Sequence, residues 1–343
     1  MTGFSQGVIV VQPDLEATLS WSWLSADDLP EIAELREATD YLDDPVERVD
    51  LAHLQDLFEA PGAKPGRHGA VGRDARGSVI AYAWGHPRRG EEELRWWIDW
   101  AVHPAWRYRG IGDACLVWLK ERGVEWWEEE VLSGIQSPLW MGAHIDEKLT
   151  LRVHQMERMG FRPEKWFSDM KVLFAEADPS QLPEAVPEGI RLVAFTDELS
   201  EAVRAAHNLA FSTVSGSKGI SREVWDHTLQ VTTMRPDWSI VALHGDEVVG
   251  YGLSSGYAAE WDAQGYTEGW TEFLGTVPAW RGRGVARAVL TRALKDFQRA
   301  GLEGAGLGVD ADSDQGAQRL FTELGYRPYE RLVLMGMRRD VDR

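Results

Sequence analysis

The sequence predicts an α/β fold built from two similar copies in tandem. At 343 residues the chain exceeds one typical domain and suits two of about 150 to 170 residues each. Pro104-Ala105-Trp106-Arg107 recurs as Pro278-Ala279-Trp280-Arg281, and Gly160-Phe161-Arg162-Pro163 recurs as Gly325-Tyr326-Arg327-Pro328, in the same order. Each copy alternates strand-like and helix-like periodicity in the order strand, helix, strands, helix, strand, helix, strands.

The two repeated tetrapeptides lie at different offsets, 174 residues for the first and 165 for the second. Met170 and Met335 share the shorter offset. The nine-residue difference predicts an insertion in the first copy, within residues 125–139.

A proline-rich segment separates the copies. Pro179, Pro183 and Pro187 are spaced four apart, which prevents a helix and is typical of a semi-rigid linker. We therefore expect an N-terminal domain at residues 15–176, a linker at 177–189 and a C-terminal domain at 190–343. An ordinary long loop, the alternative, would still place a boundary near Asp178.

Hydrophobic patterns predict the elements of each copy. In the first, residues 19–24 alternate like a strand, and Asp27 or Asp28 can cap a helix over residues 29–38. Residues 79–84 and 94–102 have the pattern of strands separated by a turn-rich stretch at 85–90. The second copy has strand patterns at 190–195, 239–243, 248–253 and about 271–277, a helix capped near Thr196, and a turn at His244-Gly245-Asp246.

A glycine-containing turn follows the last of these strands in both copies. It is Arg107-Tyr108-Arg109-Gly110-Ile111-Gly112 in the first and Arg281-Gly282-Arg283-Gly284-Val285-Ala286 in the second. Apolar residues then recur on one helical face, at Ile111, Cys115, Leu116 and Leu119, and at Val285, Val289, Leu290, Ala293, Leu294 and Phe297. Each turn should open a helix, and Gly123 and Gly301 are expected to end those helices.

Such a turn suits a diphosphate. A helix N-terminus presents unpaired N–H groups and the positive end of its dipole, and glycine lets the backbone approach the phosphate oxygens. Arginines in the turn can add charge-assisted hydrogen bonds. A Rossmann dinucleotide site is the other interpretation, but it requires a parallel βαβ unit, whereas short turns here join antiparallel strands.

The turn resembles motif A of GNAT acyltransferases, and residues 307–326 resemble the strand and helix that follow it, with Asp310, Ser313, Ala317, Leu320, Phe321 and Gly325. Over about residues 15–340 the chain is similar to actinobacterial tandem GNAT proteins of the mycothiol synthase type. The resemblance implies two GNAT domains, each a mixed, mostly antiparallel sheet flanked by helices. In such folds the motif A strand and the next strand splay apart, and pantetheine lies between them.

The resemblance also implies acetyl-coenzyme A, or another acyl-coenzyme A, as cofactor. Strand backbone would pair with pantetheine, one N–H would polarise the acyl carbonyl, and the turn would hold the diphosphate. The implied cofactor residues are Trp100, Ala101, Val102, Arg107, Tyr108, Arg109, Gly110, Ile111 and Gly112, and Leu274, Gly275, Thr276, Val277, Arg281, Gly282, Arg283, Gly284, Val285 and Ala286.

The catalytic groups depart from the family pattern. Trp96 and Trp270 fill the position six residues before the first residue of V/T-x-P, Val102 or Thr276, where GNAT members often carry a glutamate. Glu272 and Glu268 flank Trp270 on the same strand face, and we take Glu272 as the general base; an ordinary structural glutamate is the alternative.

In the first copy the nearest carboxylate is Asp99, on the opposite strand face unless a bulge shifts the register. Phe321 and Met156 occupy the place of the family's tyrosine acid and cannot donate a proton. His144 could substitute in the first copy, although a lone histidine is more often structural. We interpret Cys115 as a core residue.

Composition restricts the partners. The formal charge of −19 argues against nucleic acid and is compatible with a cationic amine. One cysteine leaves no disulfide framework or thiol cluster for a metal, and no run approaches the ~18 apolar residues of a membrane helix, so we expect a cytoplasmic protein without a membrane partner. Most of the 17 tryptophans are expected in the core rather than in an aromatic acceptor cleft.

The sequence thus predicts an acyl-coenzyme A-dependent N-acetyltransferase acting on a small-molecule amine by direct transfer in a ternary complex, with the second copy catalytic. The first copy would be a second cofactor site or a degenerate support. A tandem pair is compatible with a monomer. The alternatives are a non-catalytic acyl-coenzyme A sensor, a protein or peptide N-acetyltransferase, and an antibiotic-modifying enzyme.

Overall fold

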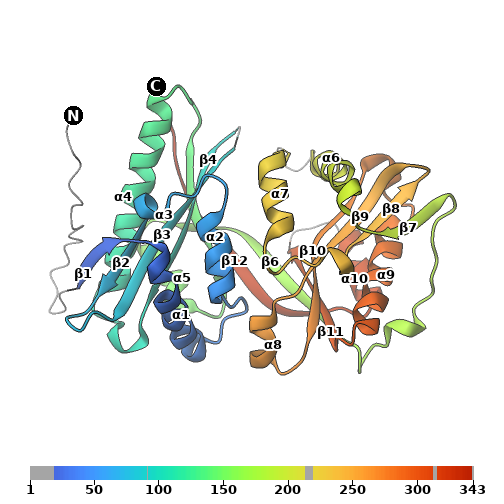
Figure 1. The fold of residues 1–343 in the computed structure, drawn as a ribbon, viewed down its shortest axis with the longest axis horizontal. Coiled ribbons are helices and arrows are strands. Elements are labelled where there is room, and N and C mark those ends of the chain that lie inside the picture. The colour runs from blue at the N-terminus through green and yellow to red at the C-terminus, as the bar shows by residue number, and fades with distance from the viewer. Residues whose placement is uncertain (1–18, 91, 213–218, 312–314, 342–343) are drawn as a thin grey trace. The chain divides into compact units, whose positions relative to one another are not determined.

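A computed structural model describes residues 19–90, 92–212, 219–311 and 315–341 (Figure 1). The chain divides into two compact units: unit 1 contains the residues up to Lys165 and from Val333 onward, and unit 2 contains Trp166–Leu332. Two strands, residues 162–173 and 327–339, carry residues of both units. The compact units therefore differ from the sequence repeats at these two strands. The N-terminal domain at 15–176, the linker at 177–189 and the C-terminal domain at 190–343 remain a prediction about the repeats.

Unit 1 has a sheet in the order β1-β2-β3-β4-β5, with the end of β12 beside β5. Its strands are β1 (Ser20–Trp23), β2 (Gly69–Arg73), β3 (Val79–Arg89), β4 (Leu94–Val102) and β5 (Leu139–Asp146). Its helices are α1 (Leu29–Asp43), α2 (Leu51–Glu59), α3 (Pro65–His68), α4 (Ile111–Leu132) and α5 (Thr150–Arg158), with 3-10 turns at Ala26–Asp28 and Pro104–Trp106.

Unit 2 has a sheet in the order β6-β11-β10-β9-β8-β7. Its strands are β6 (Arg162–Leu173), β7 (Ile190–Ala194), β8 (Ile240–His244), β9 (Glu247–Ser255), β10 (Glu268–Thr276), β11 (Gly304–Asp310) and the first part of β12 (Arg327–Arg339). Its helices are α6 (Ser200–Phe211), α7 (Arg222–Gln230), α8 (Ala258–Gln264), α9 (Val285–Arg299) and α10 (Gln315–Glu323), with 3-10 turns at Pro179–Gln181, Asp197–Leu199, Pro236–Trp238 and Pro278–Trp280.

The strand register of these sheets confirms the predicted mixed, mostly antiparallel architecture. Among the ladders whose register is described, all run antiparallel except β4 with β5 and β10 with β11. The two parallel ladders stop early: β4 pairs only from Leu94 to Trp97, and β10 only from Glu268 to Thr271. Both strands continue beyond their last paired residue, to Val102 and Thr276, so the backbone edge facing β5 or β11 is left open there.

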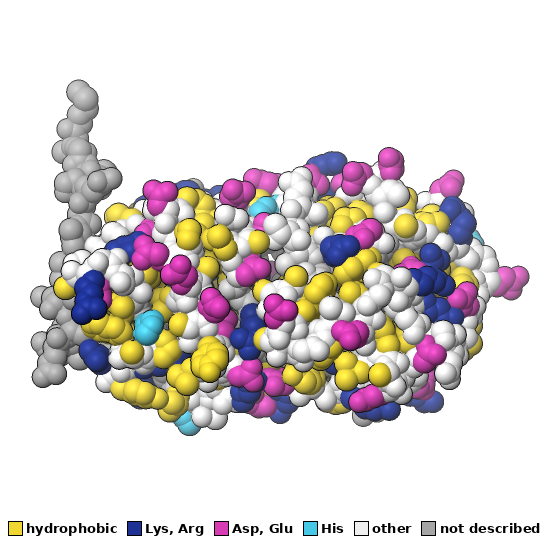
Figure 2. All heavy atoms as spheres, turned by 60° about the horizontal axis from the view of Figure 1, so that its bottom comes forward, with side chains coloured by type: hydrophobic (Ala, Val, Ile, Leu, Met, Phe, Trp, Pro, Cys, Tyr) yellow, Lys and Arg dark blue, Asp and Glu magenta, His cyan; other side chains and the backbone are white. Residues whose placement is uncertain are grey.

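Tryptophans fill much of the core, as expected. Trp84, Trp96, Trp140 and Trp225 are among the largest fully buried side chains. On the surface, Figure 2 shows acidic and basic side chains interspersed over one face of the molecule. The charge of −19 is therefore not gathered into a single acidic field on that face.

Two glycines have a different role from the one predicted. Helix α4 does not end at Gly123 but continues to Leu132. A Cβ at Gly123 would lie only 2.8 Å from Cδ1 of Trp96, so glycine there permits close packing rather than ending the helix. Strand β3 likewise runs through the expected turn at 85–90 as far as Arg89, and a Cβ at Gly85 would overlap the Trp96 ring. Gly301 does end α9, with φ +84° and an N–H bonded to Gln298.

The first-copy insertion lies where the spacing predicted it. Helix α4 has 22 residues and its counterpart α9 has 15, and the additional residues of α4 fall at its C-terminal end. The segment 125–139 therefore contains extra helical turns rather than a long loop.

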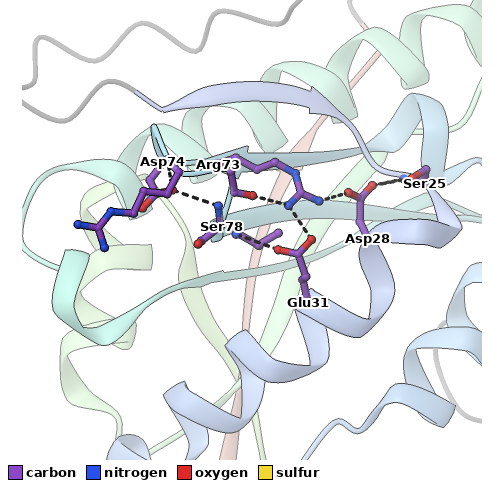
Figure 3. A network of polar contacts seen from close by, with 9 residues as sticks. Ser25, Asp28, Glu31, Arg73, Asp74 and Ser78 are labelled. Atoms are coloured by element: carbon purple, nitrogen blue, oxygen red, sulfur yellow. Dashed lines mark hydrogen bonds and ion pairs between the residues drawn. The ribbon is translucent and has the colours of Figure 1, made fainter.

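A polar network fixes the start of α1 on the β2–β3 hairpin (Figure 3). Asp28 accepts hydrogen bonds from the Ser25 N–H (2.8 Å) and hydroxyl (2.7 Å) and pairs with Arg73 (2.5 Å), which also pairs with Glu31 (2.8 Å). These contacts orient α1, which extends five residues past its predicted end at residue 38, to Asp43. That extension brings Thr39 and Asp43 to the site described below.

Candidate functional site

The two repeated turns share one backbone conformation. Gly110 and Gly284 precede α4 and α9 with φ of 74° and 84°, and Tyr108 and Gly282, two residues earlier, also have positive φ of 62° and 72°. The first intrahelical bonds run from the Ala114 N–H to Gly110 and from the Ala288 N–H to Gly284. The N–H groups of the three residues before each of these donors precede the helical bonding pattern, which is the arrangement that binds anionic oxygens.

The arginines of the turns also act alike in both copies. The Nε of Arg107 donates to the Val102 carbonyl (3.4 Å), and the Nε of Arg281 donates to the Thr276 carbonyl (3.3 Å). Arg107 further forms a two-pronged ion pair with Asp43 (2.6 and 2.7 Å), and Arg281 donates to the Ala210 carbonyl. The first arginine of each turn therefore links the turn to the end of the strand and to a helix of the same unit, α1 or α6.

The second arginine stacks on the tryptophan of the repeated Pro-Ala-Trp. Arg109 lies 4.8 Å from the Trp106 ring centre, and Arg283 lies 4.9 Å from that of Trp280. Cation–π stacking engages the flat face of the guanidinium, so neither stacking contact occupies its N–H groups.

A cavity of about 570 Å³ lies against the first turn, within unit 1. Helix α1, the open end of β4, the turn and helix α5 with the residues before it line this cavity: Thr39, Asp43, Trp100, Ala101, Val102, Arg107, Tyr108, Gly110, Gly112, Asp113, Lys148, Leu149, Thr150, Leu151, Arg152, Gln155 and Arg158. Most of the first-copy cofactor residues predicted from the sequence are brought together here. Arg109 and Ile111 are not in this lining; Ile111 is buried under the helix.

Arg152 is a lining residue that the sequence analysis missed. Its Nη2 donates to the Trp100 carbonyl (3.0 Å), its guanidinium stacks 4.4 Å from the Trp100 ring centre, and its buried Nε has no hydrogen-bond partner among the described residues. The residue at the 165 offset in the second copy is Ala317. An alignment of the two copies at that offset pairs Arg152 with Ala317, and this difference is the sequence signal for Arg152.

Glu272 occupies an irregular point of β10. The pairing of β10 with β9 shifts register between Thr271 and Phe273, so Glu272 is the additional residue of a bulge. Its Oε2 accepts a hydrogen bond from the Tyr257 hydroxyl (2.6 Å). Burial raises the pKa of the Glu272 carboxyl, and the hydrogen bonds from Tyr257 and Ser255 oppose this shift.

The neighbouring residues of β10 have other partners. Glu268 is buried and forms an ion pair with Lys171 (2.9 Å), which makes it a structural carboxylate. Trp270 packs on β11, where a Cβ at Gly306 would lie 2.4 Å from its ring, and stands edge-on to Tyr257. Glu272 is thus the member of the Glu268–Glu272 pair whose contacts leave it compatible with a proton-transfer role.

The first copy lacks this arrangement in its described β3–β4 ladder, where Val102 to Leu94 pair with Ala81 to Arg89 without a register shift. Asp99 lies on the strand face opposite Trp96, as expected for regular alternation, and accepts hydrogen bonds from Tyr82 (2.5 Å) and Arg36 (3.2 Å). Burial opposes ionisation of Asp99, but the Arg36 charge and the Tyr82 hydroxyl outweigh it and lower the pKa of this carboxyl.

A tyrosine occupies equivalent register positions in the two sheets. Tyr82 pairs with Ala101 in unit 1, and Tyr251 pairs with Gly275 in unit 2, 174 residues after Ala101. Tyr82 contacts Arg36 of α1, whereas the Tyr251 hydroxyl lies 2.7 Å from Nδ1 of His207 on α6. Burial lowers the pKa of His207 to about 4, so this imidazole is neutral in the folded protein at pH 7.

The remaining sequence candidates are structural or peripheral. Met156, Phe321 and Cys115 are buried, which confirms Cys115 as a core residue, and burial raises the pKa of its thiol to about 12. His144 lies on β5 with its ring 5.2 Å from that of Trp97. Ser313 lies outside the described residues. No helix in the described part of the chain is long and apolar enough to cross a membrane, and no His, Cys, Asp or Glu triplet there is grouped for a metal ion.

Comparison with known proteins identifies relatives of this architecture. The model of the acetyltransferase (GNAT) family matches residues 29–136 and 203–326. Mycothiol acetyltransferase from Pseudarthrobacter chlorophenolicus is 25% identical over 242 residues, which cover 70% of this chain and 69% of that protein.

Two solved structures are similar over nearly the whole chain. A GCN5-related N-acetyltransferase from Sphaerobacter thermophilus has a TM-score of 0.70 at 25% identity, covering 94% of this chain and 97% of that one. A tandem GNAT protein from the clavulanic acid biosynthesis pathway has a TM-score of 0.70 at 18% identity, covering 95% and 100%, and so shares the fold. Because the two regions matched by the family model together span more than half of the sequence, the chain belongs to the acetyltransferase (GNAT) family and is a tandem N-acetyltransferase dependent on an acyl-coenzyme A.

Proposed function

We propose that the chain transfers an acetyl group from acetyl-coenzyme A directly to a small-molecule amine, and that the second copy is catalytic. The observation that carries this proposal is the bulge at Glu272. It combines an irregular strand with a carboxylate of raised pKa next to the open edge of β10. The regular β4 of the first copy offers neither feature at the equivalent position.

The second turn fits the diphosphate of the cofactor. Gly282 and Gly284 take the left-handed backbone conformation without steric cost, and a Cβ at Gly282 would meet no atom within 4 Å, which leaves space for a ligand against the turn. The N–H groups at the start of α9 would hold phosphate oxygens. When bound, the cofactor supplies an acyl thioester, the activated carbonyl that the amine attacks.

Open backbone on β10 would position that carbonyl. The residues from Leu274 to Thr276 lie beyond the last pair with β11. Their backbone groups on that side can pair with the pantetheine arm, apart from the Thr276 carbonyl, which accepts a hydrogen bond from Arg281. A bulge turns a strand's backbone groups out of the ladder, and a free N–H there stabilises developing negative charge on the carbonyl oxygen.

Glu272 would accept the proton of the amine. An alkylammonium with a pKa near 10 must lose a proton before it attacks, and a carboxylate whose pKa is raised by burial is a stronger base than one in water. The Tyr257 hydroxyl orients Glu272 Oε2 at 2.6 Å. With Phe321 unable to donate, the thiol leaves as a thiolate or takes its proton from water.

A small-molecule acceptor is supported by the relative named as a mycothiol acetyltransferase. The test is thiol release from acetyl-coenzyme A by the purified full chain, over a panel of small amines and a peptide panel. Release with small amines and not with peptides is expected. Release with peptides alone would contradict the acceptor class, and cofactor binding without release on either panel would favour a sensor module.

The choice of copy is tested with matched variants. Gly284→Trp and Gly110→Trp place the same bulk at the equivalent position of each turn. Gly284→Trp should lower kcat/KM at least about 100-fold, whereas Gly110→Trp should retain it within about threefold. The reverse order would assign catalysis to the first copy.

A further inference from the structure

Arg152 occupies the place in the first copy where an extended ligand would pair with the open strand. Beyond Trp97 the edge of β4 is free of β5, and the Trp100 carbonyl is one of its acceptors. That carbonyl already accepts a hydrogen bond from Arg152 Nη2 at 3.0 Å, and the guanidinium covers the Trp100 ring. An arm that ran along β4 would have to displace both contacts.

The second copy differs at this point. The repeat offset of 165 aligns Met156 with Phe321 and Arg152 with Ala317. Met156 and Phe321 play the same local role, since each carbonyl accepts the N–H of the residue five positions on, Phe161 or Tyr326. The alignment therefore holds through this helix, and the second copy has a methyl group where the first has a guanidinium.

The first-copy cavity nevertheless favours anions. Four basic side chains line it, Arg107, Lys148, Arg152 and Arg158, against two acidic ones, Asp43 and Asp113. Arg107 pairs with Asp43, Arg158 with Asp113 and Lys148 with Asp146, whereas the hydrogen bond of Arg152 goes to a carbonyl. The start of α4 opens into the same cavity through Gly110 and Gly112. The Arg152 charge and the helix N-terminus together suit a diphosphate.

The charge of Arg152 is incompletely balanced. Its Nε is buried and has no hydrogen-bond partner in the part of the chain that the structure describes. Burial and the nearby Arg36 lower the pKa of its guanidinium, although Asp99 partly compensates. A buried guanidinium with a free donor is stabilised by an anionic ligand.

We propose that the first-copy cavity is a nucleoside diphosphate site that excludes a thioester arm, and that Arg152 is the residue that sets this specificity. The proposal rests on the proposed function, in that the turns bind diphosphates. The cavity takes the 3′-phosphorylated adenosine diphosphate end of the coenzyme, and the arm stays off β4. The first copy then senses the nucleotide without presenting an acyl group for transfer.

The test measures ligand binding by calorimetry with the full chain carrying Gly284→Trp. This substitution blocks the turn of the second copy, so binding reports on the turn of the first copy. The probes are coenzyme A and 3′-phospho-ADP. With Arg152 present the two ligands should bind within about threefold of each other, because the arm adds no contact. Adding Arg152→Ala should make coenzyme A at least about tenfold tighter than 3′-phospho-ADP.

Two further variants serve as controls. Arg158→Ala removes the same charge from the cavity, but Arg158 pairs with Asp113 on α4, so its loss should weaken both ligands alike. Ala317→Arg, in a chain carrying Gly110→Trp, transfers the guanidinium to the second copy and should abolish its preference for coenzyme A over 3′-phospho-ADP.

The outcomes separate the two proposals. In the Gly284→Trp chain with Arg152 intact, coenzyme A binding at least about tenfold tighter than 3′-phospho-ADP overturns the inference. So does binding of the probes to the Gly110→Trp chain but not to the Gly284→Trp chain. Both leave the proposed function standing. If the unmodified chain binds neither probe nor acetyl-coenzyme A, the proposed function itself fails.

Discussion

Tyr108 and Gly282 occupy the same left-handed position of the two repeated turns, with φ of 62° and 72°. The first copy keeps this backbone with a tyrosine, a residue that is 89% exposed. A non-glycine residue in this region costs about 1 kcal/mol. The turn conformation is therefore maintained against its local steric cost, which is the behaviour expected of a ligand-binding loop.

The second copy allows this cost to be measured. A Cβ at Gly282 would meet no atom within 4 Å, so Gly282→Ala changes backbone strain without a clash. We expect it to lower the free energy of unfolding by about 1 kcal/mol in urea denaturation. Tyr108→Gly is the matched control and should leave stability unchanged or raise it. A loss of stability in that control would show that the tyrosine side chain stabilises the turn.

Glu272→Gln removes the base while keeping the shape of the side chain. The proposed mechanism predicts a fall in kcat of about 10²- to 10⁴-fold with little change in KM for acetyl-coenzyme A. Steady-state kinetics near neutral pH measures both. An unchanged kcat would exclude Glu272 as the base and favour a water relay.

The Tyr257 hydroxyl sets the pH profile of this step. Since burial raises the pKa of Glu272 and the hydrogen bond from Tyr257 opposes the shift, Tyr257→Phe should raise that pKa further. The acid limb of the kcat profile, where the base becomes protonated as pH falls, should move to higher pH. An acid limb at unchanged pH would show that protonation of Glu272 does not cause the loss of activity at low pH.

The Lys171–Glu268 pair is predicted to serve stability and not catalysis. Its side chains are 9% and 4% exposed and lie 2.9 Å apart. Glu268→Gln leaves the buried Lys171 ammonium without its carboxylate partner, with the neutral Gln264 as a remaining hydrogen-bond acceptor. It should cost about 3 kcal/mol of unfolding free energy, while activity per folded molecule is retained. Thermal denaturation beside active-site titration distinguishes this from a catalytic role.

His207 should make the fold sensitive to acid. Burial lowers the pKa of His207 to about 4, below its ordinary value of 6.5. The unfolded chain therefore binds a proton more readily, and stability falls as the pH decreases from about 6.5 to about 4. Between about pH 7 and pH 5 its contribution should reduce stability by about 2 kcal/mol. His207→Gln should remove that part of the pH dependence in urea titrations, and an unaltered slope would contradict it.

Repetition and strand alternation were sufficient to predict much of this fold. The strand at Leu94–Val102 was predicted with its observed bounds, because buried and partly buried residues alternate along most of it. The glycines were harder: Gly85 and Gly123 have the composition of turns and helix ends, yet both serve to admit the Trp96 ring. Packing against residues distant in the sequence determines the role of these glycines, and a single sequence does not show that packing.

The candidate site divides in the same way. The turns follow from local backbone chemistry and could be located from glycine spacing. Arg152 lies 52 residues from the Trp100 carbonyl that it contacts, and Arg36 lies 46 residues from Tyr82, so their roles depend on packing of separate elements. The bulge at Glu272 likewise depends on the register of β9 and leaves no mark in the sequence of β10.

The last residues of the chain, from Val333 onward, belong to unit 1, where the end of β12 lies beside β5. A shortened polypeptide that stops at residue 176 would keep β5 but lose its neighbour, exposing an unprotected strand edge prone to self-association. Separately expressed halves are thus poor substitutes for the intact polypeptide, and loss of the residues from Val333 onward would damage unit 1, most of which lies in the first half of the sequence.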